Sequence, residues 1–306
     1  MSILALDVGG THLRSAWIEE SELVDDLCVR VELSKLCAKA VERAERQLVD
    51  ILLSHIRDRL DQRPARAVAL GMPGFINSEG VIVSSPNLPG IQNFALHQSL
   101  QTAIGLPVIV ANDALCAVQG AWLLENPRPR SLAILTLGTG VGGGLVLDGR
   151  PVVGDNGTAM EIGHFLAVPN GFVCGCGKRG CLEQYASATA LTHLDSEMGG
   201  PGRSAERLAL AARRGEVKAK DLFNQAGAYL GHAVATLVML VDVRTVRFGG
   251  GMSRSWDLLE EGFYGSMEEH LIPSLRGCID IASVPATAID RIGLIGAADL
   301  VSRGQS

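Results

Sequence analysis

The sequence lacks the features that would mark a protein for nucleic acid, a membrane or secretion. Its 306 residues include 27 Lys and Arg against 33 Asp and Glu, so no basic excess is available to displace counterions from DNA or RNA. Its longest apolar run, Ala233 to Val241, falls far short of the roughly 20 residues of a membrane helix. The first residues carry no basic segment and meet an acid at Asp7, which argues against a signal peptide. We therefore expect a cytoplasmic protein with no nucleic-acid or membrane partner.

Low-complexity segments are also missing. Charged residues make up 20% of the chain and hydrophobic residues 47%, a balance typical of compact globular proteins. The length favours two domains. The stretch Pro127 to Pro129 cannot continue a helix, and we expect the domain boundary there.

Two segments repeat one design. Residues 3–18 and 132–147 each read as an apolar strand, a glycine turn that contains Thr, and a second strand. This repetition predicts two similarly built lobes. Strand and helix signals alternate elsewhere, which indicates an α/β fold. The expected helices cover residues 36–60, 113–124, 218–240, 292–301 and a segment from about 255, and the expected strands cover 67–71, 81–84, 108–111 and 245–248.

One short stretch combines a histidine with three cysteines. Thiolate and imidazole are the ligands that Zn²⁺ prefers, and four of them close a tetrahedron with no open position. Gly175, Gly177 and Gly180 permit the sharp bends of a metal-binding knuckle. We predict a structural zinc site with the ligands His164, Cys174, Cys176 and Cys181.

Two other interpretations of these cysteines are weaker. Buried thiols are common in protein cores, but three cysteines within eight residues among Gly and Lys do not form an apolar pattern. A disulfide framework is disfavoured because the total of seven cysteines is odd and the other four are scattered.

The first glycine turn is a candidate phosphate site. Its residues are Asp7, Gly9, Gly10 and Thr11, and the glycines let backbone N–H groups approach an anion. Asp7 is placed to hold Mg²⁺ through water. A plain glycine hairpin with a capping Asp is the alternative.

The second glycine turn contains Gly138, Thr139 and Gly140 and matches the spacing G-x-G-x-x-G. A dinucleotide-binding fingerprint must open a helix. Here residues 144–149 continue as a strand into a turn, so we reject that interpretation. Two such hairpins in corresponding halves favour a clamp around a polyphosphate.

Asn112 and Asp113 stand where a strand ends and a helix begins, an edge where α/β sheets bind ligands. Asp113 is a candidate to accept a proton from a substrate hydroxyl, or it is simply the N-cap of the helix.

Asn87 lies between two prolines and is either a binding group or a turn residue. Glu161 and Glu183 flank the predicted knuckle, and they are either hydrogen-bonding groups for a sugar or solvated surface acids.

With these residues in hand, the chain resembles the ROK family within the actin-like and hexokinase-like ATPase superfamily. The resemblance runs from Leu4 to the last helix. It rests on D-V-G-G-T at 7–11, M-P-G at 72–74, S-P-N-L-P-G at 85–90, N-D-A at 112–114, L-G-T-G-V-G-G-G at 137–144, E-I-G-H at 161–164, C-G-C-G-K-R-G-C-L-E at 174–183 and F-G-G-G-M-S at 248–253.

This resemblance implies a two-lobed α/β fold of duplicated ribonuclease-H-like domains with the active site in the cleft between them. The small lobe is residues 1–126 with a returning helix at about 291–306, and the large lobe is residues 127–290. ATP phosphates are expected on the two hairpins, adenosine near Gly249, Gly250 and Gly251, and a catalytic base at Asp113. The implied sugar contacts are Gly74, Asn87, Asn112, Asp113, Glu161, His164 and Glu183.

Two positions depart from the family pattern. Leu115 stands two residues after Asp113 where Asn is common, and Ala111 stands where an acid is common. Both positions bear on helix packing and pocket shape, and therefore on the choice of substrate.

We therefore predict a hexokinase that uses ATP, Mg²⁺ and structural Zn²⁺ to phosphorylate an aldohexose such as glucose, at the 6-hydroxyl. Alternatives within the family are kinases for N-acetylmannosamine, N-acetylglucosamine, allose or fructose. A sugar-responsive transcription regulator is disfavoured because the first hairpin begins near residue 7 and leaves no room for a DNA-binding module. An actin-type structural ATPase would leave the knuckle unexplained. A homodimer is expected by family analogy alone.

Overall fold

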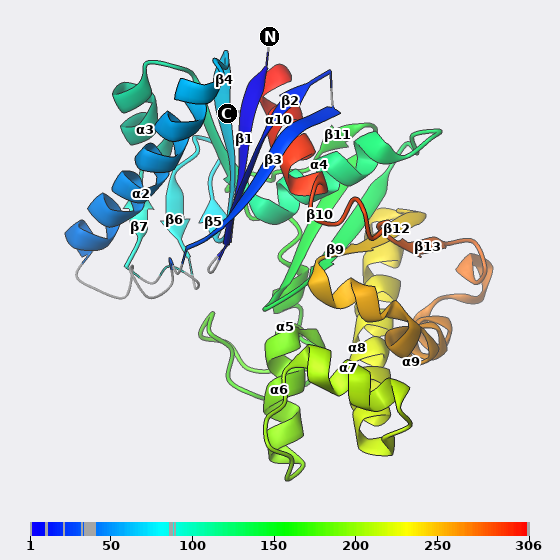
Figure 1. Cartoon of the computed structure of the whole chain (residues 1–306). Coiled ribbons are helices and arrows are strands. Elements are labelled where there is room, and N and C mark those ends of the chain that lie inside the picture. The colour runs from blue at the N-terminus through cyan, green and yellow to red at the C-terminus, as the bar shows by residue number, and fades with distance from the viewer. Residues whose placement is uncertain are drawn as a thin grey trace. The chain divides into compact units, whose positions relative to one another are not determined.

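The computed structural model describes residues 2–9, 12–20, 22–31, 33, 41–85, 88 and 90–304 (Figure 1). Gly10, Thr11 and Asn87, three of the predicted site residues, lie outside these ranges. The chain divides into two compact units. Unit 1 comprises residues 1–128, 151–159 and 291–306, and unit 2 comprises residues 129–150 and 160–290.

Unit 1 is built on a five-stranded sheet with the order β3-β2-β1-β4-β8. β1 and β2 form the predicted hairpin, and β1, β4 and β8 run parallel. A separate small antiparallel sheet has the order β5-β6-β7. The elements are β1 Ile3–Val8, β2 His12–Glu19, β3 Glu22–Arg30, α2 Val41–Gln62, β4 Ala67–Met72, β5 Phe75–Ile76, β6 Ile82–Ser84, β7 Gln92–Phe94, α3 Leu96–Ile104, β8 Val108–Asn112, α4 Asp113–Leu124 and α10 Ile292–Ser302.

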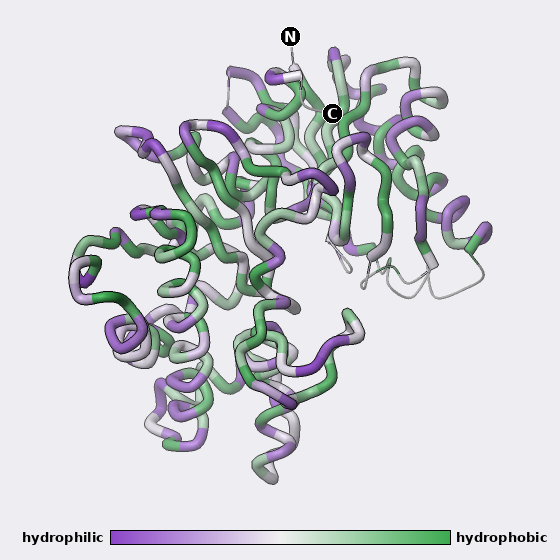
Figure 2. Tube along the Cα trace, turned by 180° about the vertical axis from the view of Figure 1, so that it is seen from behind, coloured by the Kyte–Doolittle hydropathy of each residue, from purple (hydrophilic) through white to green (hydrophobic). Residues whose placement is uncertain are grey.

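The alternation of side chains along the strands gives this sheet two separate cores. Successive side chains of a strand point to opposite faces. On β1, Leu4 and Leu6 therefore join the core that contains Leu48 and Leu52 of α2. Ile3 of β1 belongs to the other core, which α10 and Cys116 of α4 complete. The inner strands β1 and β4 are buried along almost their whole length, whereas α2 alternates between hydrophobic and hydrophilic residues (Figure 2).

Helices α4 and α10 pack with their backbones almost in contact. A Cβ at Gly120 would lie 1.9 Å from the carbonyl oxygen of Ile292, and one at Gly296 would lie 1.8 Å from that of Cys116. Gln119, which is fully buried, donates from Nε2 to Oδ2 of Asp299 at 2.7 Å. Glycine at these positions is therefore what allows α10 to lie against α4.

We expect Gly296→Ala to lower the free energy of unfolding by about 3 kcal/mol, because the added methyl forces the two backbones apart. The matched control is Gly265→Ala in the middle of α9, where a Cβ meets nothing within 4 Å. That change should raise stability by about 0.5 to 1 kcal/mol, because Ala loses less backbone entropy than Gly in a helix. Urea unfolding of both variants checks the opposite signs, and equal effects would contradict the packing argument.

Unit 2 carries a second five-stranded sheet with the order β11-β10-β9-β12-β13. β9 and β10 form an antiparallel hairpin, and β9, β12 and β13 run parallel. The elements are β9 Leu132–Leu137, β10 Val141–Leu147, β11 Arg150–Pro151, η1 Ile162–His164, α5 Glu183–Ala186, α6 Ala188–Glu197, α7 Ala205–Arg213, α8 Val217–Val241, β12 Thr245–Gly249, η2 Gly251–Ser255, α9 Trp256–His270, η3 Pro273–Leu275 and β13 Asp280–Ser283.

The two sheets share one plan. Position by position, β3-β2-β1-β4-β8 corresponds to β11-β10-β9-β12-β13, with a hairpin in the same place and parallel strands after it. The prediction of two similarly built halves is confirmed. The second glycine turn is followed by strand β10, not by a helix, which agrees with the rejection of a dinucleotide fingerprint.

Some expectations differ from the structure. The helix expected over residues 36–60 is described from Val41 to Gln62, and residues 36–40 lie outside the description. Residues 151–159, assigned from the sequence to the second lobe, pack with unit 1. A Cβ at Gly157 would lie 2.0 Å from the carbonyl oxygen of Ile76, so the backbone of this segment packs directly against β5. Among the described residues, no helix is both long enough and apolar enough to span a membrane.

Candidate functional site

In unit 1, the first glycine hairpin follows directly from β1. Gly9 donates its N–H to the carbonyl oxygen of His12 at 2.8 Å, which closes the turn. Asp7 is half-buried near the end of β1 and lies opposite Arg14 of β2. A Cβ at Gly293, in the first turn of α10, would lie 3.5 Å from the Asp7 carboxyl carbon. The first turn of α10 therefore lies close to this carboxylate, at a distance that would still admit a Cβ in van der Waals contact.

Asn112, not Asp113, is the N-cap of α4. The Asn112 side chain accepts from the N–H groups of Ala114 at 2.9 Å and Leu115 at 3.1 Å. Asp113 is the first residue of the helix, and its Oδ1 accepts from the N–H of Ala114 at 2.8 Å. The alternative that Asp113 is merely the N-cap is therefore wrong. Both Asn and Asp are favoured caps, so residue type could not decide between neighbours.

The cap also ties down the loop that contains Gly74. Asn112 donates from Nδ2 to the carbonyl oxygen of Gly74 at 2.9 Å. Gly74 has a φ of 122°, and a Cβ there would lie 2.7 Å from both the carbonyl oxygen of Ser84 and the Cβ of Ser85. Only glycine fits this position, because an L side chain would meet both strain and a clash.

Asp7 and Asp113 lie at the same end of the first sheet. Cys116, one turn into α4, is fully buried, and burial raises the pKa of its thiol well above the ordinary value. The negative charges of Asp113 and then Asp7 add to that rise in pKa. The register of the sheet agrees, because Asp7 in β1 pairs with Gly71 of β4, which pairs with Ala111 of β8, two residues before Asp113.

In unit 2, the four predicted metal ligands come together. Their ligand atoms all lie within 4.8 Å of one another. The Nδ1 atom of His164 lies 3.7 Å from Sγ of Cys174, and Sγ of Cys176 lies 3.7 Å from Sγ of Cys181. Zinc–sulfur bonds of about 2.3 Å in a tetrahedron place sulfur atoms about 3.8 Å apart, so the residues present fit Zn²⁺. All six cysteines in the described part of the chain are free thiols.

The knuckle is folded by its own backbone. Cys174 donates its N–H to the carbonyl oxygen of Lys178, and Gly177 donates to that of Cys174, at 2.8 and 2.9 Å. Gly177 and Gly180 have φ values of 89° and 77°, which other L residues rarely adopt. Burial raises the pKa of the Cys181 thiol to about 12. Three thiols held together in this way are suited to a cation that stabilises their thiolate forms.

Two carboxylates stand beside the knuckle. Oε2 of Glu161 lies 3.9 Å from Nε2 of His164, the ring nitrogen that does not face Cys174. Burial, followed by the nearby charge of Glu183, raises the pKa of Glu161 to about 7. Met160, just before Glu161, has a φ of 66°, an uncommon conformation for a non-glycine residue. Glu161 and Glu183 are therefore neighbours in a partly buried environment, which disfavours the interpretation as solvated surface acids.

The second glycine hairpin lies against this cluster. Oε2 of Glu183 accepts the N–H of Val141 at 3.1 Å, and Ala188 donates its N–H to the carbonyl oxygen of Gly138 at 2.9 Å. A Cβ at Gly163 would lie 1.9 Å from the carbonyl oxygen of Val141. No local pattern in the sequence predicts these contacts, because they join residues more than 20 positions apart.

The predicted adenosine loop also reaches the hairpin. Gly249 ends β12, Gly250 has a φ of 79°, and a Cβ there would lie 2.4 Å from the carbonyl oxygen of Leu137. Gly251 opens the 3₁₀ turn η2. Unit 2 thus brings the hairpin at 138–140, the loop at 249–251 and the carboxylates beside the knuckle into one connected region.

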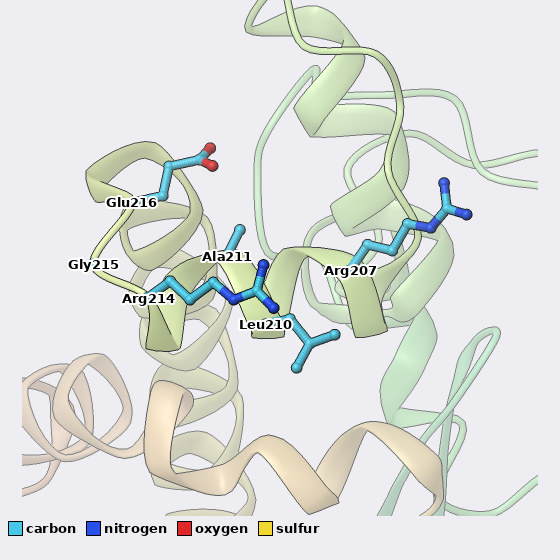
Figure 3. A pocket seen from close by; sticks show the side chains of 6 residues that line it. All are labelled: Arg207, Leu210, Ala211, Arg214, Gly215 and Glu216. Atoms are coloured by element: carbon cyan, nitrogen blue, oxygen red, sulfur yellow. The ribbon is translucent and has the colours of Figure 1, made fainter.

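A shallow surface depression at the end of α7 contains none of the predicted residues (Figure 3). It is lined by Arg207, Leu210, Ala211, Arg214, Gly215 and Glu216. Both arginines are exposed, and Glu216 pairs with Arg203 at 2.7 Å. Nothing in this depression resembles a catalytic arrangement.

Comparison with known proteins identifies the family to which the chain belongs. A sequence model described as the ROK family matches residues 3–304. A glucokinase of Thermotoga maritima is 30% identical over 317 residues, covering 98% of this chain and 97% of that protein. An N-acetylmannosamine kinase of Salmonella typhi is 33% identical over 265 residues, covering 85% and 87%.

A solved structure agrees with these relatives. The ROK family glucokinase from Streptomyces griseus, in complex with glucose and AMPPNP, superimposes with a TM-score of 0.84 at 27% identity. The match covers 99% of this chain and 100% of that one. The predicted α/β fold of two matching sheets is thereby confirmed. Because the family model spans nearly the whole sequence and the relatives match end to end, this chain belongs to the ROK family.

Proposed function

We propose that this protein is an ATP-dependent hexokinase that transfers the γ-phosphoryl group to the 6-hydroxyl of an aldohexose, with glucose as the first candidate. The observation that carries the proposal is the placement of Asp7 and Asp113 at one end of the first sheet of a ROK-family chain. Phosphoryl transfer depends mainly on positioning and charge neutralisation. One carboxylate can orient and deprotonate the attacking hydroxyl, and another can hold the Mg²⁺ that neutralises phosphate charge.

Asp113 is the proposed catalytic base. It accepts the proton of the sugar hydroxyl as that oxygen forms a bond to the γ-phosphorus, while the bond from phosphorus to the β–γ bridging oxygen breaks and ADP leaves. Its place at the start of α4 is fixed by the Asn112 cap. Asp7 is the proposed partner of Mg²⁺, an ion that neutralises phosphate charge and takes few carboxylates.

The remaining predicted residues have binding roles in this proposal. The hairpins at residues 9–11 and 138–140 hold the ATP phosphates through backbone N–H groups, and residues 249–251 approach the adenosine. Carboxylates and amides suit the hydroxyls of a sugar. The proposed sugar contacts are Gly74, Asn87, Asn112, Glu161, His164 and Glu183.

The Cys and His cluster is the proposed site of a structural Zn²⁺. When bound, zinc would cross-link the segment between Glu161 and Glu183, from His164 to Cys181, and so hold the backbone next to both carboxylates in place. His164 would use Nδ1 for the metal, since Nε2 faces Glu161.

An N-acetylmannosamine kinase is the second candidate. It is supported by the relative of that name at 33% identity, slightly above the 30% of the glucokinase. Leu115 and Ala111 flank Asn112 and Asp113 and are the positions at which this chain departs from the family pattern, so we infer that they influence which sugar is accepted.

A coupled ADP-release assay with ATP and a panel of sugars tests the proposal. The panel contains glucose, mannose, allose, fructose, N-acetylglucosamine and N-acetylmannosamine. We expect kcat/KM for one of them to exceed that for the others, and hydrolysis of ATP without sugar to be slow. If no sugar accelerates ATP consumption, the hexokinase proposal is wrong, and a sugar-responsive regulator or a structural ATPase becomes the better explanation.

A further inference from the structure

Glu183 makes a direct contact with the second glycine hairpin. Its Oε2 accepts the backbone N–H of Val141 at 3.1 Å, across 42 positions of the sequence. Val141 is buried and is the first residue of β10, directly after the turn at 138–140. A residue proposed to bind the sugar is therefore also bonded to the element proposed to bind the ATP phosphates.

The carboxylate of Glu183 occupies the space that a side chain at position 140 would need. A Cβ at Gly140 would lie 2.1 Å from Oε2 of Glu183 and 3.1 Å from its carboxyl carbon. Gly138, in the same turn, has nothing within 4 Å of a Cβ. A side chain at 140 would therefore displace the Glu183 carboxylate, whereas a Cβ at 138 would meet nothing within unit 2.

The segment that carries Glu183 holds the turn at a second point. Ala188 donates its N–H to the carbonyl oxygen of Gly138 at 2.9 Å, and Gly138 donates to that of Gly140 at 3.0 Å. Leu182 donates to the carbonyl oxygen of Phe165 at 2.9 Å, which fixes the start of the segment beside the knuckle. Residues 182–188 therefore bind the turn at two points, Gly138 and Val141, while Leu182 attaches the start of this segment beside the knuckle.

We propose that Glu183 is a positioning residue that couples hexose binding to the conformation of the phosphate-binding hairpin. This inference rests on the proposed function. Among the described residues, Oε1 of Glu183 accepts no hydrogen bond, whereas Oε2 accepts the N–H of Val141. A hexose hydroxyl bound at Oε1 would therefore fix the carboxylate, and with it the N–H groups that face the nucleotide. Hexose and nucleotide then strengthen the binding of each other by the same factor.

Binding of AMPPNP, measured by titration calorimetry with and without the sugar that is phosphorylated best, tests the coupling. Glu183→Ala removes the acceptor for Val141, and we expect AMPPNP to bind about 5- to 20-fold more weakly even without sugar, in the lower part of the range for a buried N–H group that loses its acceptor. The strengthening of AMPPNP binding by sugar should also disappear. Glu183→Gln keeps an oxygen acceptor and should retain AMPPNP affinity within about 2-fold.

The matched control is Gln184→Ala, on the same turn of α5, whose side chain makes no hydrogen bond among the described residues. It should bind AMPPNP as the wild type does. Gly140→Ala provides an independent perturbation, because it displaces the carboxylate without changing Glu183. Since both substitutions disrupt one contact, the double variant should lose much less affinity than the product of the two single losses.

The outcomes separate the inference from the function it rests on. If Glu183→Ala weakens sugar binding but leaves AMPPNP affinity and its response to sugar unchanged, Glu183 is a sugar contact only and the inference is overturned while the kinase proposal stands. Multiplicative losses in the double variant would overturn it equally. If the wild-type protein binds AMPPNP but phosphorylates no sugar, the proposed function fails first and the inference fails with it.

Discussion

Asp113→Asn is expected to lower kcat by about 10²- to 10⁴-fold while the fold and the affinity for sugar are retained, because the substitution removes a general base. The structure explains why the fold should survive. The cap of α4 is made by Asn112, and an Asn side chain at 113 can still accept the N–H of Ala114. The loss should therefore appear in turnover alone. A coupled assay gives kcat, and calorimetry with sugar gives the binding constant.

The control for this change is Asp61→Asn, the same chemical change at an exposed carboxylate in α2 of the same unit. It should leave kcat unaltered. A value of kcat for Asp113→Asn within a few fold of the wild type would refute the role of Asp113 as base. A loss of sugar affinity without a change in kcat would make it a binding residue instead.

The repeated elements of the fold were predictable because their signals are local. Each glycine hairpin lies between two strands whose pattern is complete within 16 residues, so residues 3–18 and 132–147 were recognisable without tertiary information. The long helix α8 was likewise expected, over residues 218–240, and is observed within one residue of both predicted ends. Strand β3, Glu22–Arg30, was missed because it is a largely exposed edge strand without alternation of polar and apolar residues.

The Cys and His cluster could be predicted from the sequence, but the contacts between distant residues of the site could not. The spacing of Cys174, Cys176 and Cys181 identified the cluster, since ligands of one metal recur at short intervals. By contrast, the bond from Glu183 to Val141 joins distant residues, and no pattern along the chain signals such a contact. The choice between Asn112 and Asp113 as N-cap needed backbone geometry, since both residue types cap helices equally well.

Freshly purified protein that has not met a chelator is expected to contain about one zinc per chain, and Cys181→Ser should reduce that content to near zero. Cys181 is fully buried, and its Sγ lies 3.7 Å from that of Cys176, so the hydroxyl of Ser would replace a thiolate at the centre of the cluster. Because binding of a structural metal contributes directly to folding, the free energy of unfolding should fall by about 4 kcal/mol or more. Elemental analysis and urea unfolding measure the two effects.

The exposed thiol of Cys278 supplies the matched control, and Cys278→Ser should keep both the zinc and the stability of the wild type. The alternative to a metal is a disulfide between two of the clustered thiols, which would leave the protein free of zinc and lower its mass by about 2 Da. Intact mass under non-reducing conditions distinguishes these cases. A metal-free protein with all thiols reduced and full stability would show that the knuckle is held by its backbone hydrogen bonds alone, and the structural role of zinc would then be wrong.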